Sequence, residues 1–136
     1  MFNRCSSLSD ITALANWNVS NVLDMNSLIA HTAVSDVSAL ANWNTSSVTT
    51  MQAMFYKTNI SDVSALANWN VSSVTTMYQM FYGCSNLTDV SALANWNTSS
   101  VDSMRSMFNS CSTSQTRSSY VTNMWCMFYE CSNLFF

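Results

Sequence analysis

The most reactive side chains in this sequence are five cysteines and one histidine. Four of the cysteines stand at one fixed distance after a Met-Phe pair and so occupy one position of an internal repeat: Cys5, Cys84, Cys111 and Cys131. There is no C-x-x-C pair, and His31 has no second histidine to accompany it, so the spacing fits neither a zinc site nor a redox site. We therefore expect structural thiols and no metal, cofactor or catalytic activity. A disulfide between Cys84 and Cys111 in an oxidising compartment is the alternative, because neighbouring repeats would bring these two residues together.

A second group is a column of carboxylates, one in each of four repeats: Asp10, Asp36, Asp62 and Asp89. On extended strands they would point away from the core, about 5 Å apart, and would repel by roughly 1 kcal/mol per neighbouring pair in water. A bound cation or a basic partner would relieve this repulsion, which makes Asp36, Asp62 and Asp89 candidate binding residues. The alternative is that each carboxylate accepts hydrogen bonds from hydroxyl and amide groups of its own turn.

A third group lies where the repeats differ from one another. These positions hold tyrosines, a tryptophan and basic residues: Tyr56, Lys57, Tyr78, Tyr82, Arg105, Trp125 and Tyr129. Tyr, Trp and Arg supply most of the binding energy in protein interfaces, so we expect an aromatic and basic binding patch. Exposed tyrosines without a function are the alternative.

The elements that must position these side chains follow from a hexapeptide, Ala-Leu-Ala-Asn-Trp-Asn, that occurs at 13–18, 39–44, 65–70 and 92–97. Its tryptophans are 26, 26 and 27 residues apart, a period typical of stacked repeats. Before each copy, the spacing exemplified by Val34-x-x-Val37-x-Ala39 matches a leucine-rich-repeat strand. After each copy, the spacing of Val48-x-x-Met51-x-x-Met54-Phe55 puts all four apolar residues on one face of a short helix.

These patterns predict an α/β fold, a leucine-rich-repeat-like solenoid of about five coils with one short parallel strand and one short helix in each 26–27 residue coil. We expect a single repeat domain over 1–136 that is a fragment of a longer array, with units at about 1–28, 29–54, 55–80, 81–107 and 108–136. The terminal coils carry no polar caps, so we also expect end-to-end self-association or fraying.

Charge and hydropathy exclude several classes of partner. Charged residues make up 8% of the chain and the net charge is −3, so there is no basic stripe to neutralise the phosphates of a nucleic acid. The longest apolar runs are far shorter than the roughly 20 residues that span a bilayer, and the opening MFNRCSSL contains no apolar signal region. We therefore expect no direct membrane insertion, and an export signal and anchor that lie outside this chain.

The repeats resemble those of the BspA-like leucine-rich-repeat surface proteins, whose repeat is roughly 26 residues long. The resemblance covers nearly the whole chain and rests on a motif assembled from the units around Trp69 and Trp96, Asn-Trp-Asn-Thr-Ser-Ser-Val-Thr-Thr-Met-x-x-Met-Phe-Tyr-Gly-Cys-Ser-Asn-Leu. It implies an extracellular or surface-anchored protein that takes part in adhesion or host contact and has no enzymatic activity. We therefore expect a non-catalytic cell-surface interaction module, a rigid repeat scaffold that binds protein or glycan partners. A purely structural spacer in a larger surface protein is the alternative.

Overall fold

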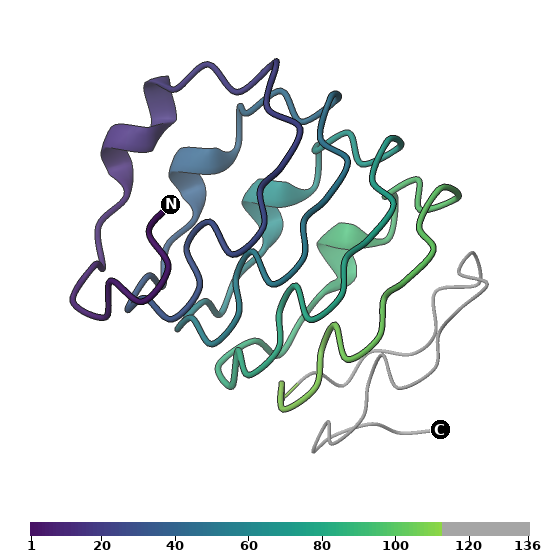
Figure 1. Ribbon diagram of the computed structural model, residues 1–136. Helices are drawn as coiled ribbons and strands as arrows, with labels where there is room; N and C mark the ends of the chain where they lie inside the picture. Colours follow the sequence, from purple (N-terminus) through teal and green to yellow (C-terminus); the bar gives the residue numbers. More distant parts are fainter. Residues whose placement is uncertain (113–136) are drawn as a thin grey trace.

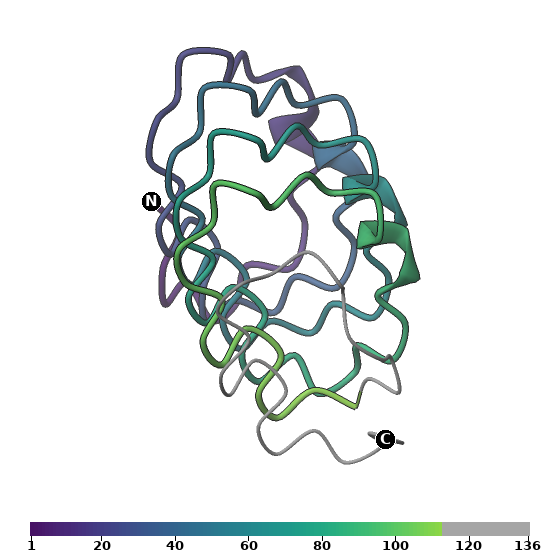
Figure 2. The ribbon, with the colours of Figure 1, turned by 90° about the vertical axis from the view of Figure 1, so that its right-hand side faces the viewer.

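The computed structural model describes residues 1–112, which form a stack of similar coils (Figure 1). Four coils each contain one short 3₁₀-helix: η1 Thr12–Asn16, η2 Ser38–Leu40, η3 Ser64–Leu66 and η4 Ser91–Leu93. These helices lie one behind another along the stack (Figure 2). At a second position, isolated parallel bridges join successive coils, from Asp24 to Thr50, from Thr50 to Thr76 and from Thr76 to Ser103.

The expected α/β solenoid with a strand and a helix in every coil is wrong. Within residues 1–112 there is no α-helix and no continuous strand, and the coils are built mainly from turns. Each hexapeptide expected to follow a strand starts in a 3₁₀-helix, and each segment expected to be helical bonds to the neighbouring coils instead. The division into five units stays a prediction, and most of the unit 108–136 lies outside the described residues.

The segments expected to be helices are pairs of consecutive four-residue turns. In the second coil, Met54 N–H donates to Met51 O over 3.3 Å, and Thr58 N–H donates to Phe55 O over 3.2 Å. The third residue of each turn has a positive φ, 52° at Ala53, as a type II turn requires. The equivalent residues in the four coils are Ser27 and His31, Ala53 and Lys57, Gln79 and Gly83, and Ser106 and Ser110. We call the segments 25–32, 51–58, 77–84 and 104–111 together the turn strip.

In the first three coils, every second N–H group of the turn strip donates to the following coil. The donors of the second coil and the acceptors of the third are Met51 to Thr76 (3.1 Å), Ala53 to Tyr78 (2.9 Å), Phe55 to Met80 (2.9 Å) and Lys57 to Tyr82 (2.7 Å). The coils before and after repeat this ladder, and all of these N–H groups point the same way along the stack. The hydrogen bonds within the turns and those of the ladder together pair the backbone polar groups of the strip, without a helix or a sheet.

The four-residue turns explain why the apolar spacing suggested a helix. In the second coil, the first and last residues of each turn, Met51, Met54, Phe55 and Thr58, are buried in the core, and the residues between them are half-buried or exposed. Two consecutive turns therefore bury positions i, i+3, i+4 and i+7, which is also the pattern of an amphipathic helix. Apolar spacing alone does not distinguish these two structures.

The hexapeptide begins in a 3₁₀-helix because its surroundings carry helix signals. Ala and Leu are good helix formers. At the start of η2, the Asp36 carboxylate accepts a hydrogen bond from Ser38 N–H over 2.8 Å, which satisfies a backbone group that the helix leaves unpaired. Val37 and Leu40 are then three positions apart, and both are buried. A strand would have required alternating burial instead.

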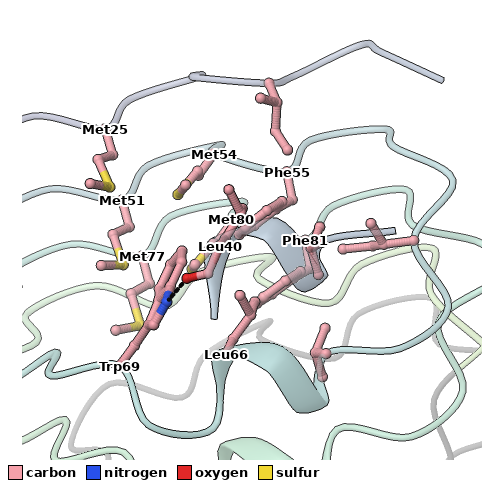
Figure 3. Close-up of a cluster of buried hydrophobic side chains, with 14 of the residues drawn as sticks. Met25, Leu40, Met51, Met54, Phe55, Leu66, Trp69, Met77, Met80 and Phe81 are labelled. Atoms are coloured by element: carbon pink, nitrogen blue, oxygen red, sulfur yellow. Dashed lines mark hydrogen bonds between the residues drawn. The ribbon is translucent and has the colours of Figure 1, made fainter. Parts of the chain in front are cut away.

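The tryptophan of each later hexapeptide bonds to the coil before it. The indole Nε1–H groups donate from Trp43 to Leu14 O (2.9 Å), from Trp69 to Leu40 O (2.9 Å) and from Trp96 to Leu66 O (3.0 Å). Figure 3 shows the bond from Trp69 to Leu40 inside the core. These three indoles are buried and stack in parallel, with centroids 6.4 and 6.5 Å apart. These three tryptophans are core residues, whereas Trp17 is 40% exposed.

Identical side chains also stack along the rest of the core. The ring of Phe81 lies parallel to those of Phe55 and Phe108, with centroids 5.2 and 5.4 Å away. Met25, Met51 and Met77 form a second buried column (Figure 3). Each core position therefore packs against its own copy in the next coil, which explains why the apolar residues of the repeat vary so little within this sequence.

We expect Ala53→Gly to stabilise the protein, because a φ of 52° disfavours a residue that carries a Cβ atom. The free energy of unfolding, measured by urea denaturation, should rise by about 1 kcal/mol. Ala33→Gly is the control: Ala33 has no positive φ, so glycine there should only lower stability. Equal effects of the two substitutions would argue against the left-handed residue in the turn.

Trp69→Ala should lower the free energy of unfolding by roughly 3 to 5 kcal/mol, because it removes a large buried side chain. Trp17→Ala should lose far less, since this side chain is partly exposed and its indole has no acceptor within residues 1–112. Thermal unfolding at low protein concentration compares the two variants. Equal melting temperatures would show that Trp69 does not have the core role assigned to it.

Candidate binding surface

The outward residues of the turn strip bring an aromatic cluster together. Tyr56 and Tyr82 come from successive coils, and their rings lie parallel with centroids 4.8 Å apart. The ring of His31 tilts against Tyr56 at 5.0 Å. Lys57 Nζ lies 5.6 Å from the centre of the Tyr56 ring, within the range of a cation–π contact. We call His31, Tyr56, Lys57 and Tyr82 the tyrosine cluster.

The ladder of the turn strip holds this cluster in register. Tyr56 O accepts a hydrogen bond from His31 N–H over 2.7 Å, and Tyr82 O accepts one from Lys57 N–H over 2.7 Å. Gly83 then leaves room for the lysine, because a Cβ atom on Gly83 would lie 2.8 Å from Lys57 Cγ. Gly83 also has a φ of 71°, so glycine is favoured there for two reasons.

The polar groups at the outer ends of the tyrosine cluster remain available to a partner in the described part of the chain. Tyr56 and Tyr82 are half-buried, and within residues 1–112 neither phenolic hydroxyl forms a hydrogen bond. The Lys57 side chain is exposed. The two tyrosine rings cover one face of each other, so a partner would meet mainly ring edges, hydroxyl groups and the ammonium group.

The other residues predicted for the aromatic patch are not part of this cluster. Tyr78 lies on the same coil as Tyr82 and is half-buried, and no ring contact joins it to the cluster. Arg105 takes the place of Tyr78 in the next coil and is exposed. Trp125 and Tyr129 lie outside the described residues.

Sequence reasoning missed His31, which belongs to the tyrosine cluster, and Gly83, which leaves room for Lys57 beside it. Both occupy the repeat position of Lys57, one residue after the position of Tyr56 and Tyr82. Aligning the repeats at this position was the signal that could have found them. The expected helix gave no reason to compare this position, which holds His31, Lys57, Gly83 and Ser110 in successive coils.

The acidic column serves as a set of turn acceptors. In all four cases the carboxylate Oδ1 accepts the N–H two residues further on, over 2.7 to 2.8 Å: Thr12, Ser38, Ser64 and Ser91. These backbone bonds hold the pKa of Asp10, Asp36 and Asp89 below the ordinary value of 3.8. The charge of Asp10 opposes this weakly at Asp36, whose pKa it acts to raise.

The local role of the carboxylates is the one given above as the alternative, and binding by Asp36, Asp62 or Asp89 stays a prediction. Within residues 1–112, no three His, Cys, Asp or Glu side chains lie together in a way that could hold a metal ion. The same residues contain no helix long and apolar enough to cross a membrane.

The buried cysteines are hydrogen-bonded thiols rather than simple apolar side chains. Cys84 Sγ donates to Phe55 O over 3.1 Å, and Cys111 Sγ donates to Phe81 O over 3.0 Å. Thr58, at the equivalent position of the second coil, also donates to Phe55 O, over 3.0 Å. At this position, threonine therefore bonds the carbonyl of the first residue of its own turn, whereas cysteine bonds the equivalent carbonyl of the preceding coil.

A family model described as Mycoplasma protein of unknown function, DUF285, matches residues 1–120. No curated protein matches the chain. The match agrees with the expected repeat family only in part, since it is not specific to the BspA-like leucine-rich-repeat proteins.

We expect Asp36→Ala to lower the melting temperature, because it removes the acceptor for Ser38 N–H, and Asp36→Asn to lower it less, because the amide oxygen can still accept that bond. The lowered folded pKa values of Asp10, Asp36 and Asp89 give stability that is fully present above pH 3.8 and is lost as the pH falls through the folded values. Thermal melts from neutral pH into acid should therefore show a shallower acid limb for Asp36→Asn. An acid limb identical to that of the wild type would contradict the lowered pKa of Asp36.

Proposed function

We propose that this chain, which belongs to the family described as Mycoplasma protein of unknown function, DUF285, is a non-catalytic interaction module that binds a protein or glycan partner at a cell surface. The observation that carries this proposal is the tyrosine cluster on the outward side of the turn strip. The resemblance to the BspA-like surface proteins supports an extracellular location and a part in adhesion or host contact.

Rigidity makes the tyrosine cluster suitable for binding. Hydrogen bonds fix the strip backbone within each turn and between coils, so Tyr56 and Tyr82 are already ordered before a partner arrives. Ordered side chains lose less conformational entropy on binding, so more of the contact energy appears as affinity. Tyrosine adds a large apolar area and one hydroxyl group per contact.

The cluster geometry favours a partner rich in hydrogen-bond acceptors. The rings of Tyr56 and Tyr82 stack on each other at 4.8 Å, so a sugar or aromatic ring has only the outer faces on which to stack. The hydroxyl groups and the Lys57 ammonium, by contrast, are donors without a carboxylate beside them in the cluster. Peptide carbonyls, carboxylates and sugar hydroxyls all supply the matching acceptors.

A structural spacer is the second candidate function. Successive coils are joined by the same strip ladder and the same hydrogen bond from tryptophan to leucine. These contacts are sufficient for a rigid array whose role is to hold other parts of a protein at a fixed distance. A spacer places no demand on the outward side chains, so it would tolerate changes in the tyrosine cluster.

The test is binding of beads coated with the full chain to arrayed glycans and to immobilised extracellular-matrix proteins. We expect the double variant Tyr56→Ser and Tyr82→Ser to bind about tenfold more weakly than the wild type, the loss typical of removing interface tyrosines. Arg105→Ser should give a smaller loss that disappears at high salt, because the residue is exposed.

The matched control is the double variant Asn42→Ser and Asn68→Ser, which changes two exposed residues away from the turn strip and should bind like the wild type. If the double tyrosine variant kept both its melting temperature and full binding, the interaction module would be excluded and the spacer favoured. Equal losses in the tyrosine variant and the control would show that the binding is not specific to the cluster.

A further inference from the structure

The turn strip carries the basic side chains of the described part of the chain. Within residues 1–112, every arginine, lysine and histidine lies on the strip or on the turn at 2–5 that bonds to it: Arg4, His31, Lys57 and Arg105. The carboxylates of the same residues, which are the acidic column, Asp24 and Asp102, lie outside the strip. A chain whose net charge is −3 therefore presents its positive groups on one surface.

Three of these basic residues form a single row across successive coils. Arg4, His31 and Lys57 occupy the same repeat position, and each has a positive φ, of 65°, 55° and 52°. The strip ladder sets their register, because Arg4 N–H donates to Ala30 O over 2.9 Å and His31 N–H donates to Tyr56 O over 2.7 Å. We call Arg4, His31 and Lys57 the basic column.

The side chains of the basic column have unused donors. Arg4 and Lys57 are exposed, and within residues 1–112 neither forms an ion pair. The His31 imidazole forms no hydrogen bond within the same residues. The Tyr56 ring lies beside two members of the column, with its centre 5.0 Å from that of His31 and 5.6 Å from Lys57 Nζ. The column can therefore donate to anionic oxygens next to the tyrosine cluster.

The basic column is as regular as the stack itself. Tyr56 and Tyr82, which come from successive coils, have ring centres 4.8 Å apart, and the basic groups of the column recur with the same coil. A row of this kind runs along the stack rather than around a pocket. It matches a linear polymer whose anionic groups recur with its own repeat, as the carboxylate or sulfate groups of an acidic glycan do.

The surroundings of the column favour a glycan over a protein or a nucleic acid. The exposed large apolar side chains within residues 1–112 are Met1, Trp17 and Leu23, and none of them lies on the turn strip, so the strip lacks the apolar centre of a protein interface. Three basic groups in a row are also too few to neutralise the phosphates along a nucleic acid. The tyrosine hydroxyl groups, by contrast, suit the hydroxyl groups of sugars.

We propose that the partner of the tyrosine cluster is an acidic glycan that lies along the stack, with its carboxylate or sulfate groups on the basic column and its sugar hydroxyl groups on Tyr56 and Tyr82. This inference rests on the proposed function and names the class of partner.

Binding of the full chain to immobilised glycans tests the proposal. The probes are hyaluronate, whose anionic groups are carboxylates, and heparin, which also carries sulfates, each beside a neutral form: hyaluronate methyl ester and desulfated, carboxyl-reduced heparin. We expect binding to at least one acidic glycan, weaker at high salt, and little binding to its neutral form. Binding to hyaluronate would assign carboxylate as the recognised group, and binding to heparin alone would assign sulfate.

A pair of variants with the same change in net charge tests the column itself. Lys57→Gln should weaken binding about tenfold, because it removes a charged donor beside Tyr56, and Arg4→Gln should have a similar effect. Arg105→Gln removes the same charge from another position of the strip and should weaken binding only about twofold. Melting temperatures of these variants should match that of the wild type, since all three side chains are exposed.

Equal losses for Lys57→Gln and Arg105→Gln would overturn the proposal, because they would show that only net charge matters. Binding of a neutral form as tight as that of its acidic glycan would also overturn it, and equally tight binding of polyglutamate would do so in favour of an acidic peptide. If binding to a matrix protein or neutral glycan depended on Tyr56 and Tyr82 but not on Lys57 or salt, this inference would fail and the proposed function would stand. If no binding depended on the two tyrosines, both would fail.

Discussion

The backbone hydrogen bonds that join successive coils along the turn strip are the constraint on which the rest of this structure depends. Since every second N–H group must reach the next coil, the chain between these groups has to turn, and the third residue of each turn takes a positive φ. In the second coil, two side chains of each turn then lie in the core and two are half-buried or exposed. Phe55 and Tyr56 are neighbours in sequence, yet one belongs to the buried phenylalanine column and the other to the tyrosine cluster.

The repeat, its register and most of its core could be predicted from the sequence, but the element types could not. Residues such as Trp69, Met51 and Phe55 recur at a fixed period, so their burial follows from the stacking of coils. Their apolar spacing fits an amphipathic helix and a pair of four-residue turns equally well, and the helix was the wrong choice. Two signals pointed elsewhere: Gly83 at a strip position that takes a positive φ, and Asp36 two residues before a run of good helix formers.

The tyrosines of the candidate site could be predicted from their variable repeat positions, but their arrangement could not. Whether Tyr56 stacks on Tyr82 depends on how the outward residues of one turn line up with those of the next, and that register is a property of the strip ladder. The same register brings His31 against Tyr56. Nothing in the sequence indicates this contact, because the two residues are not at the same position of the repeat. By contrast, the sequence was sufficient to predict that the acidic column accepts hydrogen bonds within its own turns, since Asp two residues before Ser or Thr is a common turn pattern.

The most direct test of this account is the scalar coupling that NMR detects across a hydrogen bond, from the amide nitrogen of the donor to the carbonyl carbon of the acceptor. The account predicts couplings from Gln79 to Arg105 and from Phe81 to Met107, whose N and O atoms lie 3.1 and 2.9 Å apart. An α-helix in this segment would instead couple each amide to a carbonyl four residues earlier in the same coil. Couplings of that kind within 77–84, with none to 104–111, would contradict the account.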